Sequence, residues 1–322
     1  MILRFGIVGT GNISRRFTVA ARAAGMTVGA VYSRTEERGS TFAAACGIPA
    51  VYTDYAVMLA SPAVDAVYLA SPNACHAAGA IAALRAGKHV LCEKPAAVSG
   101  AEWAAMCAAA RAAKRVLMEA MRPVHDPALC FVREQLPRLG KLRQVSLSYC
   151  QYSSRYDAFR TGEVKNAFNP SLGNAALMDI GVYAAAVSAA LFGAPQAVSA
   201  RSVFLPGGFE GCGNVLLSYD GFTVSLAYSK IHDSPAPSVF LGEEGALSLD
   251  RLNPTRRLSV LLRGGREEVL PFVPAEENMV HEILAFSNLV AEGAVEHPYL
   301  AVTRDTLAVL DAVRAAAGIR FD

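Results

Sequence analysis

The sequence predicts an α/β protein of two domains, with a doubly wound parallel sheet in the first and an open, largely antiparallel sheet in the second. Three observations lead to this prediction. Short apolar runs alternate with alanine-rich helical stretches through residue 121, which is the order typical of βαβ units. A glycine-rich turn follows the first apolar run. Beyond residue 122, short runs alternate apolar and polar side chains, as strands with one solvated face do.

The composition indicates a globular protein with few options for macromolecular partners. The chain has 322 residues, of which 53% are hydrophobic, enough to bury two cores. Its 30 basic and 28 acidic residues nearly cancel, and no basic block is present. Nucleic acid is therefore not an expected partner.

Cysteine usage predicts a reducing, cytoplasmic environment. The seven cysteines are scattered and form no C-x-x-C pair, so neither a disulfide framework nor a zinc cage is expected. The first residues enter a strand pattern without a charged leader. The charge-free run 180–200 is interrupted by Gly193 and Pro195, which predicts a buried helix and no membrane partner.

The amino-terminal strand, Leu3–Val8, leads into a turn over residues 9–14 and a helix over Arg15–Ala24. Strand, glycine turn and helix in this order are the dinucleotide-binding fingerprint, although Ser14 stands where its third small residue belongs. Glycines let the backbone approach a pyrophosphate, and the start of the helix offers unpaired N–H groups. The expected contacts come from Gly9, Gly11, Asn12 and Ile13.

The second strand, Thr27–Tyr32, is followed by Ser33 and Arg34, where an acidic residue would hold the ribose of NAD. A guanidinium there suits the 2′-phosphate of NADP. Arg38 follows one helical turn later. These residues favour NADP over NAD, the alternative being arginines on a solvated loop.

A third strand over residues 65–70 ends in Ser71-Pro72-Asn73, and His76 opens a helix that runs to Ala86. This turn also lies at the carboxyl end of a strand, where open parallel sheets bind ligands. Two roles remain open for Asn73 and His76. They line the nicotinamide side of the site, or they cap the helix.

The run Lys88–Glu93 predicts a fourth strand, which Pro95 terminates because proline has no N–H to donate. Glu93 and Lys94 therefore stand at a carboxyl end and are expected to face cofactor or substrate; the alternative is a surface lysine beside a loop proline. A helix over 99–114 and a fifth strand over 116–121 complete this half.

Four motifs, in this order and spacing, resemble the Gfo/Idh/MocA oxidoreductases, and within them the dihydrodiol and xylose dehydrogenase branch. They are Gly9-Thr10-Gly11-Asn12-Ile13, Ser71-Pro72-Asn73 with His76, Glu93-Lys94-Pro95 and Met118-Glu119-Ala120. The resemblance covers nearly the whole chain. It implies a Rossmann domain over 1–121, and an α+β domain with a large, mainly antiparallel open sheet over 122–322 for substrate binding and oligomerisation. It also implies a nicotinamide cofactor and places Lys94 beside the reacting hydroxyl.

In the second half, an apolar helix over 174–183 carries Asp179 and Tyr183. Four residues apart, the two share one helical face. A carboxylate and a phenol in an apolar helix form either a satisfied core pair or part of a site. The family carries an aspartate followed four residues later by histidine or tyrosine at this helix, so the resemblance implies a catalytic role for both.

We therefore expect Tyr183 to exchange the proton of a substrate hydroxyl, because a neighbouring ammonium stabilises phenolate. Lys94 supplies that ammonium and binds the reacting oxygen, while Asp179 orients substrate and Lys94. An alternative gives the proton transfer to Lys94 itself.

Substrate contacts are predicted from three residues outside these motifs, Arg122, Tyr152 and Arg155. Tyr152 and Arg155 belong to a polar stretch whose alternative role is a solvated loop. The segment Arg122–His125 departs from the aromatic or aliphatic wall common in the branch. His232, His281 and His297 lack ligand-like spacing, so no metal is expected.

The remaining elements predict a meander of strands closed by helices over 126–136, 276–292 and 302–317. The predicted strands are 143–152, 197–204, 215–219, 223–229, 239–241, 246–249, 258–263 and 268–272.

Together these features predict an NAD(P)-dependent oxidoreductase that transfers hydride to or from a hydroxyl or carbonyl carbon of a sugar, cyclitol or cyclic diol. A homodimer or homotetramer through the antiparallel sheet is expected. Two alternatives remain: an NAD-dependent glycosidase of the same superfamily without net redox change, and a non-catalytic NADP-binding regulator.

Overall fold

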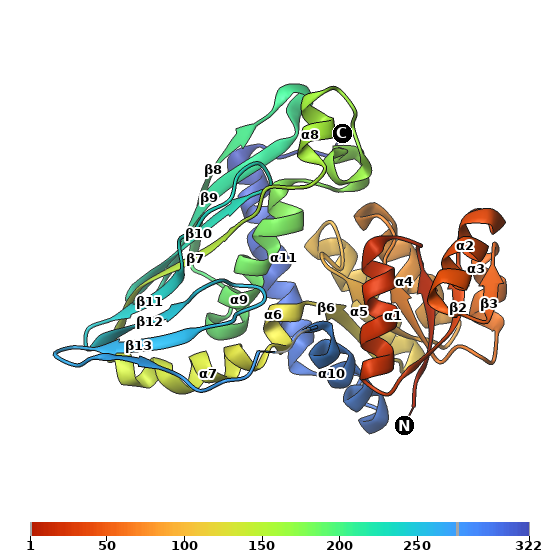
Figure 1. Cartoon of the computed structure of the whole chain (residues 1–322), viewed down its shortest axis with the longest axis horizontal. Coiled ribbons are helices and arrows are strands. Elements are labelled where there is room, and N and C mark those ends of the chain that lie inside the picture. The colour runs from red at the N-terminus through yellow and green to blue at the C-terminus, as the bar shows by residue number, and fades with distance from the viewer. Residues whose placement is uncertain (1, 275–276, 322) are drawn as a thin grey trace. The chain divides into compact units, whose positions relative to one another are not determined.

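The computed structural model describes residues 2–274 and 277–321, which form two compact units (Figure 1). The first contains the residues up to Ala120 together with Met279–Ala301. The second contains Met121–Asn278 and the residues from Val302 onward. The chain thus passes from the first unit to the second beside the predicted domain boundary at residue 121.

The first unit is built on a six-stranded sheet in the order β3-β2-β1-β4-β5-β6, with parallel pairing between all neighbours. This strand order is that of a doubly wound dinucleotide-binding sheet. The strands are β1 Arg4–Val8, β2 Thr27–Tyr32, β3 Ala50–Tyr52, β4 Ala66–Leu69, β5 His89–Glu93 and β6 Leu117–Ala120.

The sheet's connections are α1 Asn12–Ala23, α2 Glu36–Cys46, α3 Tyr55–Ala60, α4 His76–Arg85 and α5 Gly100–Ala113. Two differences from the predictions stand out. Strand β3 is absent from them because it has only three residues and no fully buried one, so β6 is the sixth strand and not the fifth. Helix α1 begins at Asn12 and not at Arg15, because Gly11 already has the extended backbone of an N-cap.

The core of the first unit is aromatic at its centre. The rings of Phe17 and Tyr68 stack with centroids 3.6 Å apart, and Phe5 meets Phe17 edge-on at 5.1 Å. Helix α10, Met279–Glu292, adds Ile283 and Phe286 to this cluster. The late segment of the chain therefore completes the hydrophobic core of the first unit.

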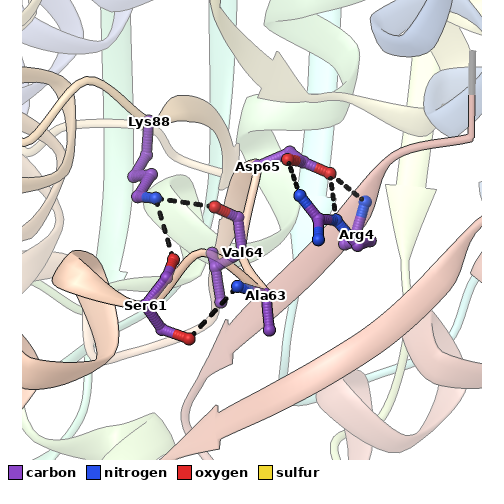
Figure 2. A network of polar contacts seen from close by, with 6 residues as sticks. All are labelled: Arg4, Ser61, Ala63, Val64, Asp65 and Lys88. Carbon is purple, nitrogen blue, oxygen red and sulfur yellow. Dashed lines mark hydrogen bonds and ion pairs between the residues drawn. The ribbon is translucent and has the colours of Figure 1, made fainter.

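A polar network fixes the amino-terminal edge of the same sheet (Figure 2). Asp65, just before β4, accepts hydrogen bonds from the Arg4 guanidinium at 2.7 and 2.8 Å and from the Arg4 backbone N–H at 3.0 Å. Lys88 Nζ donates to the carbonyls of Ser61 and Val64 at 3.1 and 2.7 Å. The turn before β4 is thus tied to the starts of β1 and β5.

The second unit is built on an eight-stranded sheet in the order β14-β13-β12-β11-β7-β10-β9-β8 (Figure 1). All its neighbours are antiparallel except β7 and β10, which run parallel from Gln144↔Thr223 to Cys150↔Ser229. The strands are β7 Leu142–Cys150, β8 Ala197–Phe204, β9 Glu210–Tyr219, β10 Phe222–Ser229, β11 Ser238–Gly242, β12 Gly245–Leu249, β13 Leu258–Leu262 and β14 Glu267–Val269.

The predicted fold class is therefore confirmed, whereas the uninterrupted meander is wrong. Strand β7, the first of this sheet in the sequence, lies between β10 and β11, so β10 and β11 are not neighbours. Turn signals alone cannot reveal this arrangement, because they report only adjacent strands. Strand β14 also ends at Val269, before the predicted end at Phe272.

The helices of this part of the chain are short, except near its middle and end. They are α6 Arg122–His125, α7 Pro127–Gln135, α8 Tyr156–Arg160, α9 Val182–Phe192 and α11 Pro298–Ala317. Of the helix predicted over 276–292, Glu276 lies outside the described residues, and helix α10 begins at Met279.

One helical stretch, Pro170–Phe192, is long and apolar enough to cross a membrane among the residues that the structure describes. Of its most apolar window, 78% is buried inside the structure. Phe192 at its end packs edge-on against Tyr219 and Phe222 of the sheet. This packing is that of a core helix.

The packing of His89 at the start of β5 predicts a pH-dependent stability. Its Nδ1 accepts the Val116 N–H at 3.0 Å, which requires the neutral ring. Burial and the nearby Arg115 lower the pKa of His89 from its ordinary 6.5 to about 4. As the pH decreases, the unfolded chain binds a proton at His89 near pH 6.5, whereas the folded chain binds it only near pH 4. Stability therefore falls as the pH decreases from 6.5 towards 4. Urea unfolding at pH 7 and 5 will show a smaller loss in His89→Asn, which keeps an acceptor without titrating; equal losses in the two proteins would contradict this.

Candidate active site

The turn after β1 has the geometry of a pyrophosphate cradle. Gly9 has a φ of +107°, and a Cβ at this residue would stand 2.6 Å from the Ala70 carbonyl oxygen, so only glycine fits. Around Gly11, by contrast, a Cβ would meet nothing within 4 Å. Gly11 is the N-cap of α1, so no side chain occupies the cap position. The exposed Asn12 and half-buried Ile13 follow it. The space beside the start of α1 at Gly11 is thus open, and the N–H groups of a first helical turn are groups that bind anions.

The segment after β2 carries two exposed guanidiniums. Arg34 follows β2 directly, and Arg38 lies in the first turn of α2. Ser33 is buried, and its N–H donates to the Tyr52 carbonyl at 3.0 Å, which fixes the start of this segment. Both arginines remain accessible at the carboxyl end of the strand, as the prediction of NADP binding requires.

The turn after β4 is held from below by His76. Its ring is 1% exposed, with Nδ1 2.9 Å from the Pro95 carbonyl and Nε2 2.9 Å from the Ser71 carbonyl. Burial lowers the pKa of His76, and a neutral ring donates to one carbonyl at a time. Pro72 is exposed and Asn73 half-buried. His76 therefore joins the turns after β4 and β5, while Pro72 and Asn73 in the first of these turns keep exposed surface.

The turn that carries Lys94 is fixed by buried carboxylates. Glu93, 6% exposed, accepts from the Tyr68 hydroxyl and from the Lys94 N–H. Glu119 on β6, 3% exposed, accepts the Ala96 N–H at 2.8 Å. The Lys94–Pro95 bond is cis. Lys94 itself is half-buried at the carboxyl end of β5, so its ammonium stands on a backbone with little freedom to shift.

In the second unit, Asp179 lies in a π-helical turn, η5 Leu177–Gly181, that precedes α9. Such turns are rare and occur often at functional sites. The Asp179 side chain is 37% exposed, and its Oδ2 is 2.9 Å from the ammonium of Lys230. Lys230 is 2% exposed, and its Nζ also donates to the Ala167 carbonyl at 2.6 Å. The partly exposed carboxylate is therefore held by a buried cation.

A second buried charged residue supports the same turn from the sheet. Glu210 on β9, 1% exposed, accepts the Leu177 N–H at 2.9 Å and the Ser202 hydroxyl at 3.1 Å. Tyr228 on β10 also hydrogen-bonds this carboxyl, whose pKa is raised by burial. The ring of Tyr228 lies against Gly181, where a Cβ would stand 3.0 Å from the ring carbon Cγ. The π-helical turn is thus fitted closely to the sheet.

Tyr183, on α9, is 3% exposed, and its contacts include Arg122 and Tyr149 of its own unit. Arg122 Nη2 donates to its hydroxyl oxygen at 3.1 Å, with the guanidinium carbon 5.9 Å from the ring centroid. Tyr149 on β7 packs edge-on at 5.1 Å. A guanidinium hydrogen bond stabilises negative charge on the phenol oxygen, so Arg122 has a partner other than the predicted substrate.

The two other predicted substrate residues lie in the segment after β7. The Tyr152 hydroxyl donates to Asp157 at 2.6 Å, and its N–H donates to Asp233 at 2.9 Å. Arg155 is exposed. These contacts are those of an ordered polar surface segment, and a role in substrate binding stays a prediction.

Within each unit the structure brings predicted residues together, and it adds partners that the sequence did not reveal. Asp179 was expected to orient Lys94, and the partner that the second unit supplies is Lys230. Neither Lys230 nor Glu210 belongs to a recognised motif, because their roles depend on strand pairing. Among the residues that the structure describes, no group of three histidine, cysteine or acidic side chains is arranged to hold a metal.

Comparisons with known proteins identify the family. The model "Oxidoreductase family, NAD-binding Rossmann fold" matches residues 3–121, and the "GFO/IDH/MocA C-terminal domain" matches residues 136–248. The two matches cover the glycine turn, the Lys94 turn and the helix that carries Asp179 and Tyr183.

Whole-length relatives agree. The chain is 41% identical to scyllo-inositol 2-dehydrogenase (NADP(+)) IolU of Bacillus subtilis, over 99% of this chain and 98% of that protein. It is 30% identical to human trans-1,2-dihydrobenzene-1,2-diol dehydrogenase, over 100% and 98% of the two chains. The 3-ketoreductase KijD10 of Actinomadura kijaniata, solved with NADP and TDP-benzene, is 27% identical with a TM-score of 0.88, over 98% of each chain. The chain belongs to the Gfo/Idh/MocA family of NAD(P)-dependent oxidoreductases, which act on CH–OH groups.

Proposed function

We propose that this protein is an NADP-dependent dehydrogenase of cyclic polyols, with scyllo-inositol or a closely related cyclitol as substrate. The observation that carries the proposal is the whole-length identity of 41% to an NADP-dependent scyllo-inositol dehydrogenase. The residues of this chain fit the assignment, since a glycine cradle, two exposed arginines and a pinned lysine stand at the carboxyl ends of the first sheet.

The cofactor is bound in this proposal by residues of four turns, those that follow β1, β2, β4 and β5. The N–H groups at the start of α1 hold the pyrophosphate, and Arg34 and Arg38 hold the 2′-phosphate. The nicotinamide supplies an acceptor or donor for hydride. The cofactor-binding set comprises Gly9, Gly11, Asn12, Ile13, Ser33, Arg34, Arg38, Ser71, Pro72, Asn73, His76, Glu93 and Lys94.

The proton is handled by residues of this chain. In oxidation, the substrate hydroxyl gives its proton to the deprotonated oxygen of Tyr183 while hydride leaves the carbon that bears this hydroxyl, and reduction returns both. Arg122 stabilises the phenol oxygen when it carries negative charge, because its guanidinium donates to that oxygen. Lys94 binds the reacting oxygen, and Asp179 orients the substrate hydroxyls. The alternative, in which Lys94 itself exchanges the proton, remains open.

Assembly and location are part of the proposal. Leu216 and Leu261 on the sheet of the second unit are 46% and 48% exposed, and apolar side chains on an open sheet favour pairing with a second copy. A homodimer or homotetramer is therefore proposed. All seven cysteines are free thiols, which supports a reducing, cytoplasmic environment.

The catalytic assignment predicts that Lys94→Ala, Asp179→Asn and Tyr183→Phe each lower kcat for scyllo-inositol oxidation by about 10²–10⁴-fold. Each variant lacks a group that acts on the reacting hydroxyl or holds it in place. The measurement is the steady-state formation of NADPH. Tyr219→Phe is the matched control, because that hydroxyl serves only Ser188 and the Gly193 carbonyl in the interactions described. Activity of Tyr183→Phe equal to that of the control would remove Tyr183 from the mechanism.

The same assay separates the alternatives. A dehydrogenase accumulates NADPH in proportion to the polyol oxidised. A glycosidase of the superfamily releases a leaving group with no net change in NADPH, and a regulator binds NADP without turnover across a panel of polyols.

The cofactor assignment predicts that Arg34→Ala raises the KM for NADP by about 10- to 100-fold, since one charge-assisted hydrogen bond contributes about 1.5–3 kcal/mol. The KM for NAD, which has no 2′-phosphate, is expected to change little. The exposed Arg85 at the end of α4 supplies the control Arg85→Ala. Equal changes for NADP and NAD would show that Arg34 does not read the 2′-phosphate.

A further inference from the structure

Lys230 is a buried cation that no motif explains. It follows β10 directly, and only 2% of its side chain is exposed. Its Nζ lies 4.7 Å from the ring centroid of Phe168 and 5.5 Å from that of Phe209. Taking an ammonium out of water is costly unless it is paired and hydrogen-bonded. The groups that compensate this one are informative, because one of them is the carboxylate of Asp179 in the candidate site.

The first compensating group is the Asp179 carboxylate, whose Oδ2 is 2.9 Å from Nζ. Asp179 is 37% exposed while Lys230 is sealed from solvent. The ion pair thus anchors one oxygen of a carboxylate that is still reachable from outside. An anchored carboxylate presents its accessible side in a defined direction, which a free side chain on a helical turn does not.

The second compensating group is the carbonyl of Ala167, which accepts from Nζ at 2.6 Å. Ala167 stands near the end of the segment 151–168, which leaves the sheet after β7 and contains α8. The backbone of Lys230 holds the other end of this segment, because its carbonyl accepts the Ser153 N–H at 2.9 Å. One residue therefore contacts the start of the segment, its end and the Asp179 carboxylate.

The parallel pairing of β7 and β10 explains how this is achieved. The register Cys150↔Ser229 brings the two strands to their ends together, and the pairing continues as the Gln151 N–H donates to the Ser229 carbonyl at 3.0 Å. Tyr152 and Lys230 are the next residues after this pair, so they follow the ends of two neighbouring strands. Along the segment, the ring of Tyr156 stacks on Phe168 and that of Phe159 packs against it at a tilt, next to the Lys230 ammonium.

We propose that Lys230 is a positioning residue that couples the order of the segment 151–168 to the orientation of the Asp179 carboxylate. This inference rests on the proposed function in so far as Asp179 serves the reaction. When a substrate hydroxyl binds Asp179, the segment 151–168 becomes more ordered, because the Lys230 ammonium contacts both the carboxylate and the segment. Order in the segment in turn favours the carboxylate orientation that binds substrate. Lys230 touches neither substrate nor cofactor in this arrangement.

Limited trypsin digestion tests the coupling without reference to activity. Arg155, Arg160 and Lys165 are exposed on the segment, and cleavage after them reports how often the segment opens. Lys230→Met, which keeps the length of the side chain without its charge, is expected to raise cleavage at these three sites about tenfold. Asp179→Asn removes the negative charge of a partly exposed side chain and keeps its shape. This variant is also expected to raise cleavage at the three sites.

Lys88→Met is the matched control. Lys88 also donates to two backbone carbonyls, those of Ser61 and Val64 (Figure 2), but it belongs to the first unit. Its loss is expected to leave cleavage after Arg155, Arg160 and Lys165 unchanged. Lys230→Arg, which restores charge and donors, is expected to recover part of the protection. If Lys230→Met does not fold, the comparison of Asp179→Asn with Lys88→Met decides the matter.

Kinetics supply the second readout. Lys230→Met is expected to lower kcat for the polyol by about 10²-fold through misorientation, with the KM for NADP unchanged. The double variant Asp179→Asn/Lys230→Met is expected to have a kcat no lower than that of Asp179→Asn alone, because Lys230 acts through Asp179. Unchanged proteolysis in both single variants would overturn the coupling. Absence of activity on every polyol would instead overturn the proposed function and leave the proteolysis result intact.

Discussion

Buried backbone groups in turns must find partners inside the protein, and at three turns of this chain the partners are buried charged side chains. Glu119 accepts the Ala96 N–H beside Lys94. Glu210 accepts the Leu177 N–H at the start of the turn that carries Asp179. Lys230 donates to the Ala167 carbonyl. Two of these bonds are buried and the third is partly buried, so the loss of any one of them removes the partner of a backbone group. The segments that carry the candidate site residues depend on this constraint.

The arrangement divides labour between charges that are sealed and charges that are accessible. Glu119, Glu210 and Lys230 are almost without exposed surface. Lys94 and Asp179, which they support, are partly exposed. A catalytic group needs contact with substrate, and it also needs a fixed geometry that solvent-exposed side chains rarely keep. In this structure the buried residues fix the geometry, and the partly exposed Lys94 and Asp179 are the groups that remain accessible.

Much of the first unit could be predicted from the sequence because its signals are local. A strand, a glycine turn and a helix that follow one another predict the cradle at Gly9 and Gly11, and Pro95 marks the end of the strand before Lys94. Strand β3 was missed, since three half-buried residues give no periodic pattern. Helix α1 begins at Asn12, but its start was predicted at Arg15, because the turn motif conceals the N-cap at Gly11.

In the second unit the signals that matter are not local. The strand positions could be predicted, but the insertion of β7 between β10 and β11 depends on partners far apart in the sequence. The role of Lys230 follows from the pairing of β10 with β7, and that of Glu210 from the contact between β9 and the turn Leu177–Gly181, so no pattern around either residue could reveal them. The helical register predicted for Asp179 and Tyr183 likewise took no account of the π-helical turn. Arg122 was predicted as a substrate contact, and its bond to Tyr183 appears only when α6 and α9 are placed together.

The parallel pairing of β7 and β10 has a further consequence for the stretch of chain that follows β7. The stretch from Gln151 to Ala167 is bonded at its start to Ser229, the last residue of β10, and at its end to Lys230, the next residue. A stretch whose ends are fixed by neighbouring points can lengthen, shorten or change composition while the sheet beneath it keeps its pairing. Exchange of this stretch between related enzymes, with Lys230 and Asp179 retained, therefore changes the length or composition of one surface segment while the sheet keeps its pairing.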